Sequence, residues 1–167
     1  MPILAAYAVP HPPIILPEIG HGEEQKIQST IKAYQEVMCR VAAHQPDVII
    51  LSSPHATLYA DYFHLSPGSG ASGNFSKFHA PSVTLQVAYD SALVKQIELN
   101  AHRWNLPAGT IGDRDKSLDH GTMIPLLFLQ KAGFACPIVR VGLSNLSTVA
   151  HYQLGQCIAQ AVNTLGR

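Results

Sequence analysis

The sequence predicts an α/β domain with a mostly parallel central sheet and helices on its flanks. Residues 3–9 and 47–52 are short apolar runs, typical of strands buried on both faces. Between them, residues 23–44 carry apolar side chains at alternating steps of four and three, which is the period of an amphipathic helix. A helix that crosses over between two buried strands favours a parallel pair joined by a right-handed connection.

The first strand of this pattern ends at Pro10, and the helix after it begins with Glu23 and Glu24, where the helix dipole favours negative charge. Residues 54–80 follow the second strand and are rich in Gly, Ser, Pro and aromatic side chains. They predict a long connection, flexible over 67–73, that either lies over a functional site or is only a surface loop. Apolar and polar residues then alternate over 83–89, which predicts a half-exposed or edge strand.

The second half of the chain continues the alternation of helices and strands. Helical spacing predicts a helix that is capped by Asp90 or Ser91, carries Trp104 on its apolar face and is ended by Pro107 and Gly109. A second helix is predicted over 122–131 and a buried strand over 138–141. The last predicted helix is capped by Ser147 or Thr148 and ended by Gly166. An α/β chain that stops after a crossover helix is prepared for another parallel strand. We therefore expect a sheet incomplete at the C-terminus, residues 1–167 as the N-terminal portion of a longer domain, and an exposed edge that favours a homo-oligomer.

Composition excludes several classes of protein. The 167 residues suit one domain, and 47% of them are apolar, which argues against disorder. Eleven basic residues balance eleven acidic ones, so we expect neither a nucleic-acid nor a membrane-surface partner. Neither a secretory signal nor a membrane-spanning run is recognisable, so a cytoplasmic location is expected. The spacing of Cys39, Cys136 and Cys157 predicts reduced and mostly buried thiols.

Nine histidines favour metal binding or proton transfer. His11 and His55 follow the first two predicted strands, and His120 precedes a helix. Loops at the carboxyl ends of parallel strands meet in one crevice, so we expect the His11 and His55 rings within ~10 Å of each other. Two neutral imidazoles with one further ligand is the arrangement of non-haem Fe(II) oxygenases. A single histidine after a strand, taken alone, is more often an ordinary hydrogen-bonded loop residue. Residues 113–115 predict a solvated turn.

Several short sequence motifs are more specific evidence of function than the positions of the histidines. They include His-Pro-Pro, Ser-Pro-His and Asp-His-Gly-Thr-Met, and they occur in order at residues 11–24, 53–55, 73–81 and 118–126. Together they resemble the LigB family, the catalytic-subunit type of class III extradiol ring-cleavage dioxygenases. Within that family the chain is most similar to the Memo-like branch associated with AMMECR1 and radical-SAM proteins.

The resemblance implies a role for each histidine. It makes His11 and His55 metal ligands and His120 an active-site acid/base, and it places the third ligand in a segment beyond residue 167. Because one ligand of a small set would then be missing, we expect these 167 residues to bind metal weakly on their own. The chain departs from the expected pattern at Asn74, where close relatives should carry an acidic residue, and at His79, where they should carry glycine.

The function that this resemblance implies is ring opening of a small catechol-like aromatic by dioxygen, with Fe(II) as the metal. Zn(II) would fit the same ligands but has no redox chemistry, so it would favour hydrolysis or an inert site. The alternative is a Memo-like metal-binding protein that works with AMMECR1-like and radical-SAM partners and cleaves no ring.

Overall fold

The computed structural model describes residues 3–112 and 117–167, so the predicted turn at 113–115 lies outside them. The α/β class is confirmed, since helices and short strands alternate along the chain. The elements in order are η1 (Pro13–Ile15), α1 (Pro17–Gly20), η2 (Glu23–Ile27), α2 (Gln28–His44), β1 (Ile49–Ser52), β2 (Phe63–His64), β3 (Gly70–Phe75), η3 (Ser76–Phe78), β4 (Ala80–Ala88), α3 (Ser91–Arg103), β5 (Ala108–Gly109), α4 (His120–Lys131), β6 (Ile138–Val141) and α5 (Thr148–Leu165).

The strands within 3–112 and 117–167 form three two-stranded ladders. β1 pairs with β6 and β2 pairs with β5, both in parallel, whereas β3 and β4 form an antiparallel pair. Single bridges connect the ladders, because Tyr89 pairs with Ile138 and Leu65 pairs with Val141 at the two ends of β6. The parallel pairing is as predicted, but the predicted single sheet is divided into these ladders around β6.

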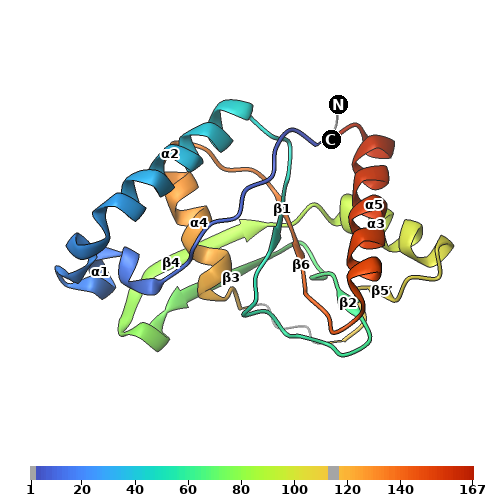
Figure 1. The fold of residues 1–167 in the computed structure, drawn as a ribbon, viewed down its shortest axis with the longest axis horizontal. Helices are drawn as coiled ribbons and strands as arrows, with labels where there is room; N and C mark the ends of the chain where they lie inside the picture. The colour runs from blue at the N-terminus through green and yellow to red at the C-terminus, as the bar shows by residue number, and fades with distance from the viewer. Residues whose placement is uncertain (1–2, 113–116) are drawn as a thin grey trace.

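Helices cover both sides of the central β1–β6 pair. Figure 1 shows α2 and α4 on one side, beside β3 and β4, and α3 and α5 on the other. Side chains of a strand point alternately to its two faces. Accordingly, Ile138 packs in the core beside α2 and α4, whereas Val139 and Val141 pack in the core beside α3 and α5. Arg140 therefore points to the same side as Ile138, towards α4.

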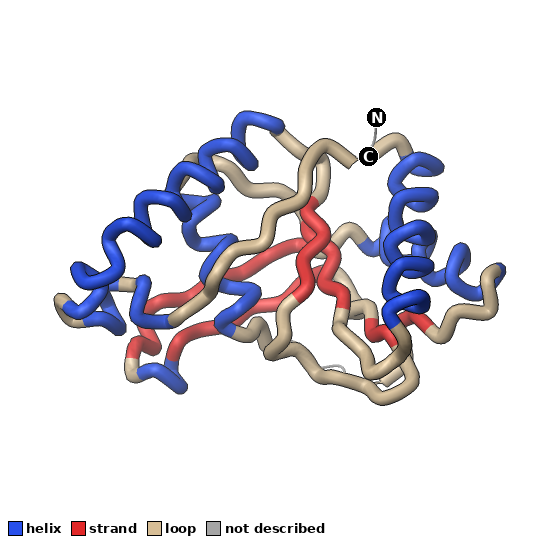
Figure 2. Tube along the Cα trace, viewed as in Figure 1, coloured by secondary structure: helices blue, strands red, loops and turns tan. Residues whose placement is uncertain are grey.

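The predicted first strand is wrong. Residues 3–9 run as an irregular segment towards α1 (Figures 1 and 2), and Ile3 and Leu4 are more than half exposed. A strand needs a neighbouring backbone with which to share hydrogen bonds, and none of the described residues pairs with this segment. An apolar run alone cannot supply that neighbour.

The predicted flexible connection over 67–73 is partly wrong, since Gly70 begins strand β3. Its glycines allow close approach of other chain segments: a Cβ at Gly73 would come within 2.8 Å of Leu118 and of the Met123 sulfur. The predicted helix over 23–44 also divides, into the 3-10 turn η2 and helix α2.

The predicted caps of α3 and α5 are confirmed. The Asp90 carboxylate accepts from Leu93 N, the Ser147 hydroxyl accepts from Ala150 N, and Gly166 ends α5 in the left-handed conformation. All three thiols are free. Cys157 is buried as predicted, but Cys39 is exposed, because a one-residue step on a helix turns the side chain about 100° away from buried Met38. No helix in the described ranges is long and apolar enough to cross a bilayer.

Candidate metal centre

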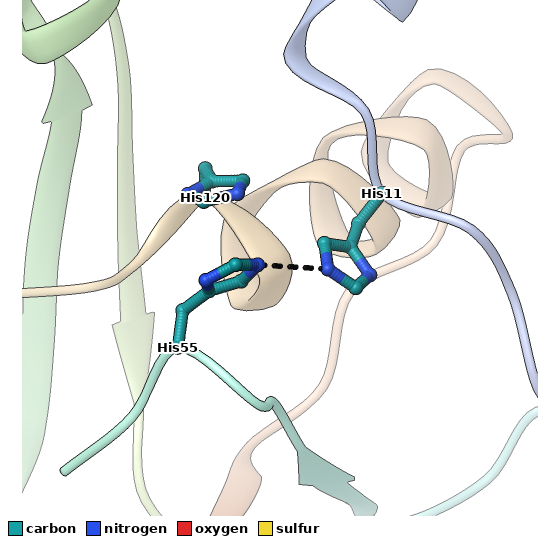
Figure 3. Close-up of side chains that lie close together, drawn as sticks. All are labelled: His11, His55 and His120. Atoms are coloured by element: carbon teal, nitrogen blue, oxygen red, sulfur yellow. Dashed lines mark hydrogen bonds between the residues drawn. The ribbon is translucent and has the colours of Figure 1, made fainter.

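Three histidines from separate parts of the chain meet at one point. His11 precedes η1, His55 lies in the loop after β1, and His120 is the first residue of α4. Figure 3 shows their rings turned towards one another, and one ligand nitrogen from each lies within 4.8 Å of the other two. The Nε2 atoms of His11 and His55 are 2.9 Å apart. The predicted proximity of these two rings is thus observed, although His11 follows an irregular segment instead of a strand.

Ser53 and Asp119 connect the loops that carry His55 and His120. Ser53 is buried, its Oγ donates to Asp119 Oδ1 at 2.6 Å, and the same Oγ accepts from the His55 backbone N–H at 3.2 Å. Asp119 is also the N-cap of α4, because its Oδ1 accepts from Thr122 N at 3.0 Å. This capping starts α4 at His120, two residues before the predicted position, and orients that residue towards the other two imidazoles.

Arg140 belongs to the same hydrogen-bond network, because it contacts Asp119. It extends from buried β6, and its Nη2 donates to Asp119 Oδ2 at 3.2 Å. Burial by itself would raise the pKa of Asp119, but hydrogen bonds from Ser53 and Thr122 and the positive charge of Arg140 hold it below its usual value. Asp119 is therefore an anion at neutral pH, adjacent in the chain to His120.

The environment of His120 favours its neutral form. Burial lowers its pKa, and nearby His55, His11 and Lys77 lower it further, although Asp119 opposes them. The Phe78 ring packs edge-on against the imidazole with the ring centroids 5.1 Å apart. A neutral imidazole has a free nitrogen lone pair, which can bind a metal ion or accept a proton.

A cavity of about 490 Å³ opens beside the cluster. His55 and His120 line it together with Asn74, Lys77 and Phe78. Its size lies within the range of small-molecule binding sites, roughly 300–1,000 Å³. The cluster therefore borders a space large enough for a small organic molecule.

The geometry suits one metal ion. Two nitrogens bound about 2.1 Å from an ion and at a right angle to each other are about 3.0 Å apart, close to the 2.9 Å between the Nε2 atoms of His11 and His55. His120 is placed differently, since its ring stacks over that of His55 at a centroid distance of 3.9 Å and a tilt of 39°. Imidazole nitrogen is a common ligand of iron, zinc and copper in proteins.

Sequence reasoning missed the residues that hold the cluster together. Arg140 carried a recognisable signal, because a charged residue within a buried strand needs a partner. Ser53 lies in the motif at 53–55, but nothing in that motif shows that its hydroxyl meets Asp119, 66 residues away. The structure places His151 away from the cluster, packed against Phe63 at a centroid distance of 4.7 Å.

The α/β fold thus brings three imidazoles, one ligand nitrogen from each, to a point beside a cavity where they could hold a metal ion. The family of the catalytic LigB subunit of aromatic ring-opening dioxygenases matches residues 5–167, and the chain belongs to this family. Over 166 residues it is 34% identical to Protein CA_C1420 of Clostridium acetobutylicum, an alignment that covers 95% of this chain and 36% of that protein. The chain thus spans about a third of the length of this curated relative.

Proposed function

We propose that this chain forms the metal-binding part of a cytoplasmic extradiol dioxygenase, which opens the ring of a catechol-like substrate with dioxygen. The observation that carries the proposal is the meeting of His11, His55 and His120 beside the cavity, in a chain of the LigB family. Fe(II) is the proposed metal. A ferrous ion supplies the activation of dioxygen, which protein side chains cannot provide.

In this proposal His11 and His55 are the ligands and His120 transfers protons. The 2.9 Å between the first two Nε2 atoms supports adjacent positions on one ion, whereas the stacked ring of His120 is better placed to face a bound substrate. A neutral His120 can accept a proton from a catechol hydroxyl and return one as the ring opens. The Ser53–Asp119 hydrogen bond joins the loop that carries His55 to the start of α4, which carries His120. The Phe78 ring restricts movement of the His120 ring.

Anaerobic loading with Fe(II), followed by dioxygen and a panel of catechols, tests this function. We expect oxygen uptake and yellow ring-opened products. His120→Gln should reduce turnover by about 10²–10⁴-fold while Fe(II) still binds, whereas His11→Ala should weaken the binding of Fe(II) itself. His102→Gln, on the exposed face of α3, is the matched control. Absence of oxygen uptake from the Fe(II)-loaded protein across a broad panel would contradict the proposal.

We also propose that residues 1–167 are the N-terminal portion of a longer domain that supplies the third ligand. The greater length of the Clostridium acetobutylicum relative supports this. Titration with Fe(II) or Zn(II) should show weak binding by the 167 residues and tighter binding by a chain extended at its C-terminus. Equally tight binding by both would mean that His120, or another residue of this chain, completes the site.

Self-association is a separate proposal. The exposed apolar side chains of Ile3, Leu4 and Tyr7 lie on a segment without a pairing partner among the described residues. Surfaces of this kind favour pairing with a second copy. Sedimentation equilibrium should give a mass above 18.0 kDa, and a monomer at all concentrations would contradict this proposal.

A Memo-like protein without ring cleavage is the second candidate, and the phrases at 11–13 and 119–123 favour it. Such a protein would bind metal through the same histidines and act with AMMECR1-like and radical-SAM partners. Neighbouring genes distinguish the two: genes for aromatic degradation favour the dioxygenase, and genes for those partners favour this candidate.

A further inference from the structure

Helix α5 is the longest helix in the described ranges, and it carries no charged side chain. Residues 148–165 contain no aspartate, glutamate, lysine or arginine. Helix α2 has nearly the same length and differs in this respect, because its exposed side carries Lys32, Glu36 and Arg40. A helix that faces water normally places charged and polar side chains on its outward side. The solvent-facing side of α5 therefore needs a separate explanation.

The two faces of α5 differ in burial. Figure 1 shows α5 beside α3, on the side of the β1–β6 pair opposite α2 and α4. Its buried residues follow helical steps of three and four and are Leu154, Cys157, Ala161 and Val162. The opposite face, here called the outer face of α5, is formed by Val149, Tyr152, Gln156, Gln160 and Asn163. Val149 and Tyr152 are 66% and 69% exposed, so this face leaves large apolar side chains uncovered.

Gly155 lies beside this outer face, in the middle of the helix. Glycine in a helix interior is less favourable than alanine. A Cβ built at Gly155 meets nothing within 4 Å among the described residues, so packing within one copy of the chain does not require glycine here. Glycine does allow another backbone to approach closely. Two packed helices have their axes 8–10 Å apart, and small side chains at the contact favour the shorter distance.

The outer face of α5 is complementary to itself. A two-fold symmetric dimer brings the same surface of both copies together, so any charge would lie close to its own equivalent. The outer face has no charge that could repel its equivalent or lose its hydration. The amides of Gln156, Gln160 and Asn163 each contain donors and an acceptor, so they can hydrogen-bond to the same groups of a second copy.

We propose that the outer face of α5 is the contact surface of a homodimer, in which the α5 helices of two copies cross beside Gly155. This inference goes beyond the proposed function, and it uses a surface other than residues 3–9. A helix of 18 residues is about 27 Å long and about 10 Å wide, which gives roughly 270 Å² in projection on each copy. Standard stable interfaces bury about 800 Å² per partner. We therefore expect a weak dimer that forms as the protein concentration rises.

Sedimentation velocity at a series of protein concentrations tests the inference. The unaltered chain should shift from the monomer mass of 18.0 kDa towards the dimer. Gln156→Arg should raise the dissociation constant of the dimer by about 10–100-fold, because a charge buried without a partner loses its hydration. Gln35→Arg makes the same change on the exposed side of α2 and should leave the dissociation constant unchanged.

Gly155→Leu separates the contact between copies from the stability of one copy. Leucine forms helices better than glycine, so Tm should rise when it is measured at low concentration, where the chain is monomeric. The same side chain should weaken the dimer, because it prevents the close approach of the two helices. Leu4→Arg tests the N-terminal segment separately. If Leu4→Arg weakens association and Gln156→Arg does not, the copies pair through that segment and the inference is overturned.

A disulfide between copies locates the contact. Cys39→Ser first removes the exposed native thiol. In that variant, Gln156→Cys should form a disulfide-linked dimer on mild oxidation, because the two equivalent positions meet near the crossing of the helices. Gln35→Cys, on α2, is the matched control and should form much less of it. Equal cross-linking at both positions would overturn the inference.

Two other results would also overturn it. The first is a monomer at every concentration, and the second is an unchanged dissociation constant in Gln156→Arg. Alkylation of the Gln156→Cys thiol then identifies the other occupant of this face. If the thiol is shielded only in a chain extended at its C-terminus, the outer face of α5 is covered by that extension and not by a second copy.

Discussion

The ion pair between Asp119 and Arg140 allows a specific prediction, namely the effect of Asp119→Asn on the stability of the fold. Asparagine retains Oδ1, so the hydrogen bonds from Ser53 Oγ and Thr122 N can persist. It replaces Oδ2 with an amide that cannot accept, and this amide faces Arg140 Nη2 and Thr122 Oγ1. Thr122 can rotate its hydroxyl to accept, but the Arg140 guanidinium cannot.

The size of the expected loss of stability depends on the hydrogen bonds that Arg140 keeps in the variant. Removal of one partner from a buried ion pair costs about 3–5 kcal/mol. Here Arg140 Nη1 still donates to Tyr89 Oη at 3.2 Å and to Ser117 O at 3.4 Å. We therefore expect the free energy of unfolding to fall by about 2–3 kcal/mol, with a decrease in Tm of roughly 5–10 °C.

Urea unfolding followed by circular dichroism measures this loss. Asp61→Asn, at an exposed position, is the control and should change stability by less than about 0.5 kcal/mol. Because the pKa of Asp119 is lowered in the folded protein, its carboxylate stabilises the fold at neutral pH. That stabilisation is lost as the pH falls through the lowered value, so the difference between the Asn variant and the unaltered protein should narrow in acid.

A double-mutant cycle with Arg140→Met tests the cause. If the loss comes from an unpaired guanidinium, the double variant should be more stable than the sum of the single effects predicts, by at least about 1 kcal/mol. Additive effects, or a loss below about 0.5 kcal/mol for Asp119→Asn alone, would refute the reasoning.

Three further substitutions test other parts of the fold. Gly121→Ala places a methyl group against Ser53 Oγ and should destabilise the protein by about 1–3 kcal/mol and weaken Zn(II) binding; an unchanged Tm and affinity would contradict the close contact. Tyr34→Phe removes a buried hydroxyl without a partner among the described residues and should raise Tm by a few degrees, whereas a decrease would indicate a hydrogen bond. Asn100→Ala removes the donor to Cys157 O between α3 and α5 and should cost about 1–3 kcal/mol in urea unfolding; a neutral result would show that this contact contributes little.

Elements with a strong local pattern could be predicted from the sequence. The helices α3 and α5 were recognised because their caps, Asp90 and Ser147, and the apolar spacing after each cap lie within one stretch of chain. Strand β6 was recognised because β-branched residues are concentrated there. The prediction of a strand at residues 3–9 was wrong because composition was its only support. A segment of suitable composition becomes a strand only when another segment of the chain pairs with it.

The sequence by itself determined the α/β class and the identity of the three histidines, because local periodicity and short phrases carry that information. Only the tertiary structure decided that His11 and His55, 44 residues apart, face each other, and that Ser53 and Asp119, 66 residues apart, join their loops. It also decided that Arg140 on β6 pairs with Asp119, 21 residues earlier in the chain. Such distances and charges arise between residues remote in the chain, and the periodicity of a single segment does not encode which remote side chains it will meet.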